Sequence, residues 1–331
     1  MTDPLPTFAD VKSAAARIKA EAVYTPLLEN AALNARVGGR VFIKPEPLQR
    51  TGSFKFRGAY NALSRFSDAQ RETGVVAFSS GNHAQGIAEA ARLLGMPATI
   101  VMPADAPEIK KQGVVARGAQ LRLYDREAES REAIAGAISA ETGATLIPSY
   151  DHPDIIAGQG TCGLEVFETL ASQGVAADQL ACCVGGGGLI GGIGLARGAL
   201  SPETQVIGVE PDGFDDHARS LAAGHRVPSP RKSGSVCDAL LAPEPGELTF
   251  ALNRHQLARV DVVSDQEALG AVRYAFETLK LVVEPGGAVA LAALLSGKLE
   301  AANRNTVIVL TGGNVDPAMF ARAIKGEARR A

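Results

Sequence analysis

Short apolar, β-branched runs alternate with helix-like stretches along most of the chain. Several of the apolar runs are continuous, which is typical of strands covered on both faces of a sheet. The runs predicted as strands are residues 41–46, 75–80, 98–102, 120–124, 145–149, 180–184, 205–210, 260–263 and 306–311. The stretches predicted as helices are residues 54–66, 83–94, 108–116, 127–142, 161–172, 190–200, 266–279 and 289–295. This alternation predicts βαβ units and hence an α/β fold with parallel strands.

Two glycine-containing turns, far apart in the sequence, each follow a predicted strand. One covers residues 79–82 and the other residues 185–192. Residues 73–148 are predicted to form a complete β-α-β-α-β-α-β block. Nine strands could form one sheet, but two turns so far apart favour two sheets. Ligands of open α/β sheets bind beyond the carboxyl ends of the strands. Two such edges facing each other would form a cleft between two domains.

Composition and charge narrow the class of protein. The chain has 331 residues, 46% hydrophobic and 21% charged, as in a globular protein of about two domains. A net charge of −3 provides no general attraction to nucleic acid or to an anionic membrane. The sequence shows no signal peptide, no apolar run of the ~18 residues that span a bilayer, and no C-x-x-C pair among its four cysteines. We therefore expect a cytoplasmic protein without a disulfide framework or a Cys/His zinc site.

The most distinctive motif is a run of glycines, Gly185 to Gly188, directly after the predicted strand at residues 180–184. Consecutive glycines let several backbone N–H groups turn toward one anion, and the positive end of the following helix adds to the attraction. A phosphate suits such a turn. The alternative is that the glycines only permit close packing of the helix on the sheet.

The same turn also satisfies a dinucleotide-binding pattern. Gly186, Gly188 and Gly191 match G-x-G-x-x-G, and Glu210 ends the next predicted strand, where a ribose-binding acid belongs. Because successive glycines satisfy many patterns, this match is only modestly specific. An NAD-dependent oxidoreductase is therefore an alternative from a different class.

A second turn, Ser79-Ser80-Gly81-Asn82-His83, lies between a predicted strand and an alanine-rich helix. Its hydroxyl, amide and backbone N–H groups at a helix N-terminus would suit a small carboxylate. Plain helix capping by Ser or Asn is the alternative use of such residues.

Lys55 is predicted in the first turn of a helix, between Phe54 and Phe56. The helix dipole and the aromatic neighbours disfavour a positive charge there, which would lower the pKa of the amine. A lysine with a lowered pKa is suited to Schiff-base chemistry. A plain surface lysine is the alternative, and the two aromatic neighbours argue against it.

With these elements together, the chain resembles the serine/threonine dehydratase and serine racemase family of pyridoxal-phosphate (PLP) enzymes, of fold type II. The resemblance is carried by four motifs, which are SFKFRGA at residues 53–59, SSGNHAQ at 79–85, AGQGT at 157–161 and TGGNVD at 311–316. It implies two open twisted sheets with flanking helices, and a cofactor in the cleft between domains. Residues 1–72 and 149–331 would form a large PLP-binding domain, and residues 73–148 a small mobile domain.

The resemblance implies a cofactor site built from separate parts of the chain. Lys55 would form a Schiff base with PLP, and Phe54 would pack on the cofactor ring. Asn82 would hydrogen-bond the ring hydroxyl, and Thr311 would contact the pyridine nitrogen. The phosphate would be held by Gly185, Gly186, Gly187, Gly188 and the backbone amide of Leu189.

For the substrate, the resemblance implies a carboxylate seat and two groups on opposite faces. Lys55 would remove the α-proton, and Ser80 would face the other side, as in racemases of the family. Arg131 occupies a position that can face an acidic group of the substrate in this family. An ion pair on the helix surface is an equal alternative for this residue. The substrate carboxylate would be received by Ser79, Ser80, Gly81, Asn82 and His83.

The loop after Glu210 resembles the family's divalent-cation loop. Its oxygen ligands would be Glu210, the Phe214 carbonyl and Asp216, which suits Mg²⁺ or Ca²⁺. The alternative is an acidic cluster that complements the dipole of a helix N-terminus.

The resemblance implies a dehydratase (ammonia-lyase) that converts a β-hydroxy amino acid, with L-threonine and L-serine expected first, to a 2-oxo acid and ammonia. Racemisation and the dehydration of 3-hydroxyaspartate are alternatives on the same fold. Two departures from the family pattern, Tyr150 and Ala239, would reshape the pocket and leave the substrate open. The family also implies a homodimer or a larger homo-oligomer.

Overall fold

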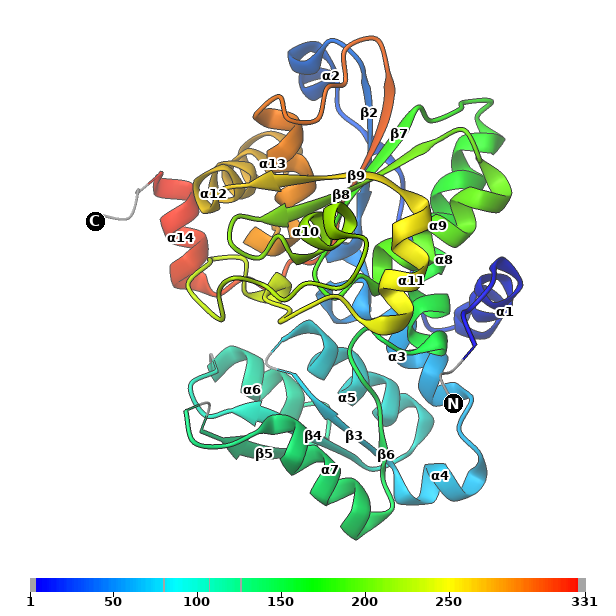
Figure 1. Ribbon diagram of the computed structural model, residues 1–331, viewed down its shortest axis with the longest axis vertical. Helices are drawn as coiled ribbons and strands as arrows, with labels where there is room; N and C mark the ends of the chain where they lie inside the picture. The colour runs from blue at the N-terminus through cyan, green and yellow to red at the C-terminus, as the bar shows by residue number, and fades with distance from the viewer. Residues whose placement is uncertain (1–3, 80, 107, 126, 327–331) are drawn as a thin grey trace.

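The computed structural model describes residues 4–79, 81–106, 108–125 and 127–326, and among these the chain forms two open sheets (Figure 1). The strands of the larger sheet are β1 (Leu28–Glu29), β2 (Arg40–Pro45), β7 (Gln179–Cys183), β8 (Gln205–Pro211), β9 (Leu257–Val263) and β10 (Asn305–Leu310). Those of the smaller sheet are β3 (Val75–Phe78), β4 (Ala98–Pro103), β5 (Gln120–Tyr124) and β6 (Thr145–Leu146). The strand orders are β1-β2-β10-β7-β8-β9 and β5-β4-β3-β6. The neighbouring strands are parallel, except for the antiparallel pair β1 and β2.

Helices cover both sheets, so the predicted α/β class with two helix-flanked open sheets is confirmed. They are α1 (Phe8–Ile18), α2 (Ala31–Val37), α3 (Lys55–Ser64), α4 (Asp68–Thr73), α5 (Asn82–Leu94), α6 (Glu108–Val115), α7 (Arg131–Thr142), α8 (Pro153–Ser172), α9 (Gly188–Leu200), α10 (Asp216–Ala223), α11 (Glu247–Gln256), α12 (Asp265–Tyr274), α13 (Val289–Leu295) and α14 (Pro317–Lys325). Figure 1 shows α12, α13 and α14 on one side of the larger sheet and α8 and α9 on the other. Within the described part of the chain, no helix has the length and apolar character that crossing a membrane requires.

Alternate side chains of β3 enter two different cores. Val75 and Ala77 pack with Ile87 of α5, whereas Val76 packs with Ala135 of α7. Successive strand residues point to opposite faces, so a sheet covered on both faces needs apolar residues at every position. This is why the buried strands appear in the sequence as continuous hydrophobic runs.

Helix α8 begins at Pro153 rather than at the predicted residue 161. The stretch before residue 161 contains glycines, which lower helix propensity. The structure shows what they are needed for, because a Cβ on Gly158 would lie 2.6 Å from the Cα of Gly58 in α3. Glycine therefore lets the backbones of α8 and α3 approach each other closely.

The pattern missed several short or polar elements. They are the two-residue edge strand β1 and the helices α1, α2, α4, α10, α11 and α14. A signal for α1 was present in the sequence, because Thr7 and Asp10 form a capping box at its start. The predicted strand at 145–149 pairs only over Thr145–Leu146, and the residues after it form a loop.

The helix α3 lies between the two sheets rather than belonging to one of them. Its side chains Phe56, Ala59 and Leu63 pack in the same core as the strands and helices of the smaller sheet. The helix also contacts α8, which covers the larger sheet. The division into residues 1–72 with 149–331 and residues 73–148 stays a prediction.

Four charged side chains, three of them buried and one partly buried, join α3 to the larger sheet. The guanidinium of Arg57 donates to Glu46 Oε2 at 2.8 Å and to Glu165 Oε1 at 2.6 Å. The ammonium of Lys44 donates to the other oxygen of Glu165. Burial opposes the ionisation of Glu46, but Arg57 and Lys44 hold the pKa of its carboxyl below the usual value. The cluster therefore holds two cations and two anions, and α3 cannot shift without separating them.

We expect Arg57→Leu to lower the free energy of unfolding by about 3–5 kcal/mol, because it leaves carboxylates buried without their partner. Urea unfolding measures this directly. Arg40→Ala is the matched control, since Arg40 pairs with Glu29 at the surface and such pairs contribute at most ~1 kcal/mol. Equal losses in the two variants would show that the buried cluster does not have this role.

Candidate active site

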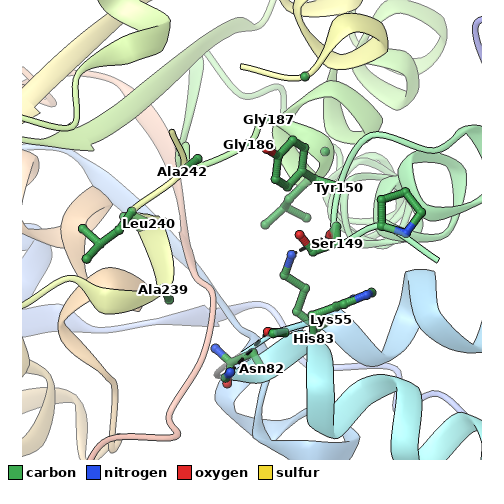
Figure 2. Close-up of a pocket in the computed structure, with 18 of the residues that line it drawn as sticks. Lys55, Asn82, His83, Ser149, Tyr150, Gly186, Gly187, Ala239, Leu240 and Ala242 are labelled. Atoms are coloured by element: carbon green, nitrogen blue, oxygen red, sulfur yellow. Dashed lines mark hydrogen bonds between the residues drawn. The ribbon is translucent and has the colours of Figure 1, made fainter. Parts of the chain in front are cut away.

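A cavity of about 360 Å³ lies between the two sheets, at the carboxyl ends of their strands (Figure 2). From the smaller sheet it is lined by the turn after β3 and by residues of α5, α6 and α7. From the larger sheet it is lined by the glycine turn after β7, by Thr311 after β10, and by residues 238–246. The position agrees with the rule that open α/β sheets bind ligands beyond their strand ends.

Lys55 is the first residue of α3 and projects into this cavity. Its Nζ donates to the carbonyl oxygen of Ser149 at 2.8 Å and lies 5.2 Å from the centre of the Phe54 ring. Burial lowers the pKa of the amine to about 8. The neutral fraction of Lys55 near neutral pH is therefore much larger than that of an ordinary lysine, as a nucleophile or a base requires.

The glycine turn connects β7 to α9, which begins at Gly188. Gly187 has φ 92°, in the left-handed region that favours glycine. The ring of Tyr150 lies against Gly186, because a Cβ there would fall 2.2 Å from the ring carbon Cγ; Figure 2 shows this contact. The N–H groups in the first turn of α9 have no partner inside the helix. The turn thus offers a phosphate the donors that it needs.

On the opposite side, the turn after β3 leads into α5, which begins at Asn82. Ser79, Gly81, Asn82 and His83 line the cavity, whereas Ser80 lies outside the described residues. Burial, and then the charge of Lys55, lower the pKa of His83 to about 3. The imidazole is therefore neutral and adds no charge to the turn.

Arg131 and Thr311 complete the candidates that line the cavity. The Arg131 guanidinium donates to Glu132 at 2.7 Å and lies 5.1 Å from the centre of the Phe78 ring. The ion pair on the helix surface that the sequence suggested is thus present between Arg131 and Glu132, and Arg131 also lines the cavity. The Thr311 hydroxyl lies 3.3 Å from the sulfur of Cys183.

The expected cation ligands form a separate cluster that does not line this cavity. Glu210 and Asp216 are buried, and their ligand atoms lie within 4.8 Å of one another and of His217. Burial, and then the charge of Asp216, raise the pKa of Glu210 well above its ordinary value. The Phe214 side chain is buried. His217 is an additional candidate ligand that sequence reasoning missed.

Sequence reasoning also missed charged groups in the cavity. Lys110 of α6 is buried and pairs with Asp238 at 2.5 Å, which links the two sides of the cavity. Glu284 is buried and also lines the cavity. Burial, and then the charge of Asp238, raise the pKa of Glu284 to about 7. No local pattern marks the Lys110–Asp238 pair, because its members are 128 residues apart.

Comparison with known proteins decides the family. The family described as "Pyridoxal-phosphate dependent enzyme" matches residues 18–312. The chain is a member of this family. The similar proteins include ammonia-lyases and racemases. Membership in this family leaves the NAD-dependent oxidoreductase alternative without support.

Individual relatives match almost the full chain. The L-threo-3-hydroxyaspartate ammonia-lyase of Pseudomonas sp is 47% identical, over 97% of this chain and 99% of the relative. That of Saccharomyces cerevisiae is 43% identical, over 98% of each chain. The structure of maize serine racemase superposes with a TM-score of 0.90 at 36% identity, covering 97% of this chain and 98% of that one.

The cavity suits the family's cofactor. The amine of Lys55, whose pKa is lowered, lines the same cavity as a glycine turn whose free N–H groups suit a phosphate. The protein is a PLP-dependent ammonia-lyase of the threonine/serine dehydratase type.

We expect PLP to attach covalently to Lys55 and not to Lys110, the other lysine that lines the cavity. Only a neutral amine attacks an aldehyde, so the rate constant of attachment should rise through pH 8 and level off above it. Unperturbed lysines would continue to gain reactivity up to ~10.4. Borohydride reduction followed by peptide mapping identifies the labelled residue.

Lys110→Ala is the matched control and should keep the label, whereas Lys55→Ala should lose it. A label on Lys110, or a rate constant that still rises at pH 10, would contradict this account of Lys55.

Proposed function

We propose that the enzyme removes water from L-threo-3-hydroxyaspartate and yields a 2-oxo acid and ammonia. The observation that carries the proposal is Arg131, a guanidinium that lines the cavity and can face a second substrate carboxylate. The names of the Pseudomonas and Saccharomyces relatives support the same substrate. L-threonine and L-serine, which the sequence placed first, have no second carboxylate for Arg131 to bind.

The substrate's two carboxylates would be bound from the smaller sheet. The α-carboxylate would meet the N–H groups at the start of α5, in the turn formed by Ser79, Gly81, Asn82 and His83. The β-carboxylate would replace Glu132 as the partner of Arg131. This exchange costs little, because the side chains of Arg131 and Glu132 are 39% and 58% exposed, and ion pairs with this access to water contribute at most ~1 kcal/mol.

PLP would be held by covalent attachment to Lys55, by Phe54 against its ring, by hydrogen bonds from Asn82 and Thr311, and by the turn from Gly185 to Leu189. When bound, it supplies the electron sink for charge that develops at the substrate α-carbon.

Lys55 performs the proton transfer. The amine of Lys55, once the substrate amine has replaced it on the cofactor, would take the α-proton. The electron pair of that C–H bond would expel the β-hydroxyl, which would leave as water, and the proton taken by Lys55 balances the one that completes this water. The enamine product becomes an imine, and water hydrolyses it to the 2-oxo acid and ammonia. Ser80 would act on the opposite face in a racemase, and a racemase activity is supported here only by the similarity to serine racemase.

We expect ammonia release to be faster with L-threo-3-hydroxyaspartate than with L-threonine or L-serine. Arg131→Ala should lower kcat/KM for the dicarboxylate about 10- to 100-fold, the equivalent of one charge-assisted hydrogen bond, and change the L-threonine value little. Arg122→Ala is the matched control, because Arg122 lies on β5 outside the cavity and pairs with Glu129. Equal losses on both substrates would contradict the role of Arg131, and a preference for L-threonine would contradict the proposed substrate.

We also propose that the cluster at Glu210 binds a divalent cation. Glu210 and Asp216 are buried carboxyl groups, and Asp216 Oδ2 and His217 Nδ1 have no hydrogen-bond partner among the described residues. Buried like charges need a proton or a cation between them. The chemistry of Glu210, Asp216 and the Phe214 carbonyl suits Mg²⁺ or Ca²⁺.

Millimolar Mg²⁺ or Ca²⁺ should raise the Tm of the wild-type protein, because a ligand that binds only the folded state stabilises it. Glu210→Gln should abolish this rise. Asp212→Asn is the matched control, since Asp212 is exposed in the same loop and should leave the rise intact. A full cation response in Glu210→Gln would place the cation elsewhere.

The homodimer and the cytoplasmic location stay predictions.

A further inference from the structure

A chain of hydrogen bonds crosses from the larger sheet to the first residue of α5. Asn314 Nδ2 donates to Asn82 Oδ1 at 2.8 Å, and Asn82 Nδ2 donates to Glu284 Oε1 at 2.5 Å. Asn82 and Glu284 are 7% and 2% exposed, so water cannot readily replace these partners. Both residues also line the cavity.

The direction of every bond in this chain is determined by one backbone group. Asn314 Nδ2 also donates to the carbonyl oxygen of Thr51 at 2.8 Å, and a carbonyl oxygen can only accept. The Nδ2 end of Asn314 must therefore face Thr51 and Asn82. Asn82 must then present its oxygen to Asn314 and its Nδ2 end to Glu284.

Asn82 consequently has one N–H group that no protein partner among the described residues uses. Its oxygen is bound by Asn314, and one of its two N–H bonds is directed to Glu284. The second N–H remains, and it is a donor. Glu284 offers an acceptor oxygen whether or not it is ionised, so its pKa of about 7 does not interrupt the chain.

The glycine at position 312 provides the space that this contact needs. A Cβ on Gly312 would lie 2.2 Å from Glu284 Oε1 and 3.1 Å from Asn82 Nδ2. Glycine at 312 therefore lets the two side chains meet directly beneath the loop that follows β10.

We propose that Asn314 and Glu284 are positioning residues that fix Asn82 with an N–H donor directed into the cavity, where it selects an anionic oxygen on the cofactor ring. A donated hydrogen bond favours the charged form of its acceptor. The inference goes beyond the proposed function, because it concerns the cofactor and holds for any amino acid substrate.

The decisive variant is Asn314→Asp, which keeps the shape of the side chain and replaces its donor by an acceptor. The carboxylate would oppose the Thr51 carbonyl and attract the Nδ2 end of Asn82, which would turn the Asn82 oxygen toward Glu284 and the cavity. We expect the PLP affinity of the apoprotein to fall at least about tenfold, the usual effect of one lost hydrogen bond. The visible absorption of bound PLP should shift toward the form with a protonated ring oxygen.

Three further variants separate hydrogen-bond direction from packing and charge. Asn314→Ala removes the donor without reversing it, so its loss of affinity should be smaller than that of Asn314→Asp. Glu284→Gln keeps an acceptor and should resemble the wild type, whereas Glu284→Ala should not. Asn303→Asp, at an exposed position, controls for the added negative charge. If Asn314→Asp does not fold, as judged by circular dichroism, the Glu284 pair still decides the question.

The proposal is overturned if Asn314→Asp binds PLP with the affinity and spectrum of the wild type. It is also overturned if Glu284→Gln is as impaired as Glu284→Ala, because charge rather than an acceptor would then be what matters. These titrations use PLP alone, so they stand whether or not 3-hydroxyaspartate is the substrate.

Discussion

The buried charge cluster around Arg57 is the constraint on which the active site depends. Arg57 can be neutralised only when α3, β2 and α8 come together, since Glu46 follows β2 and Glu165 lies in α8. An unpaired charge in that position would be strongly unfavourable. Lys55 precedes Arg57 by two residues on the same helix. The packing that neutralises Arg57 thus also fixes the direction from which Lys55 enters the cavity.

Burial of the side chains that line the cavity then determines their protonation. Burial lowers the pKa of Lys55 and makes its amine available as a base, while His83 stays neutral beside it. Lys110 and Arg131 already pair with the carboxylates Asp238 and Glu132. An acidic substrate must therefore exchange with a carboxylate of the protein, and Glu132 is the more exposed of the two partners.

The sequence was informative where a local pattern reflects a local physical need. Continuous apolar runs marked strands covered on both faces, and the turns at Gly185 and Ser79 marked the strand ends that line the cavity. Local patterns could not predict contacts between distant residues. Asn82 and Glu284 are 202 positions apart, and Lys110 and Asp238 are 128 apart. The start of α8 was predicted wrongly for the same reason. Its glycines pack against α3, which lies far away in the sequence.

The measurement that tests the account most directly is a complete balance of products from L-threo-3-hydroxyaspartate with the wild-type enzyme. Ammonia, the 2-oxo acid and each stereoisomer of the remaining substrate would be quantified in one reaction by enzymatic assay and chiral chromatography. The account predicts equal amounts of ammonia and 2-oxo acid that match the substrate consumed, with no accumulation of the isomer inverted at the α-carbon. Accumulation of that isomer with little ammonia would show a racemase and contradict the account.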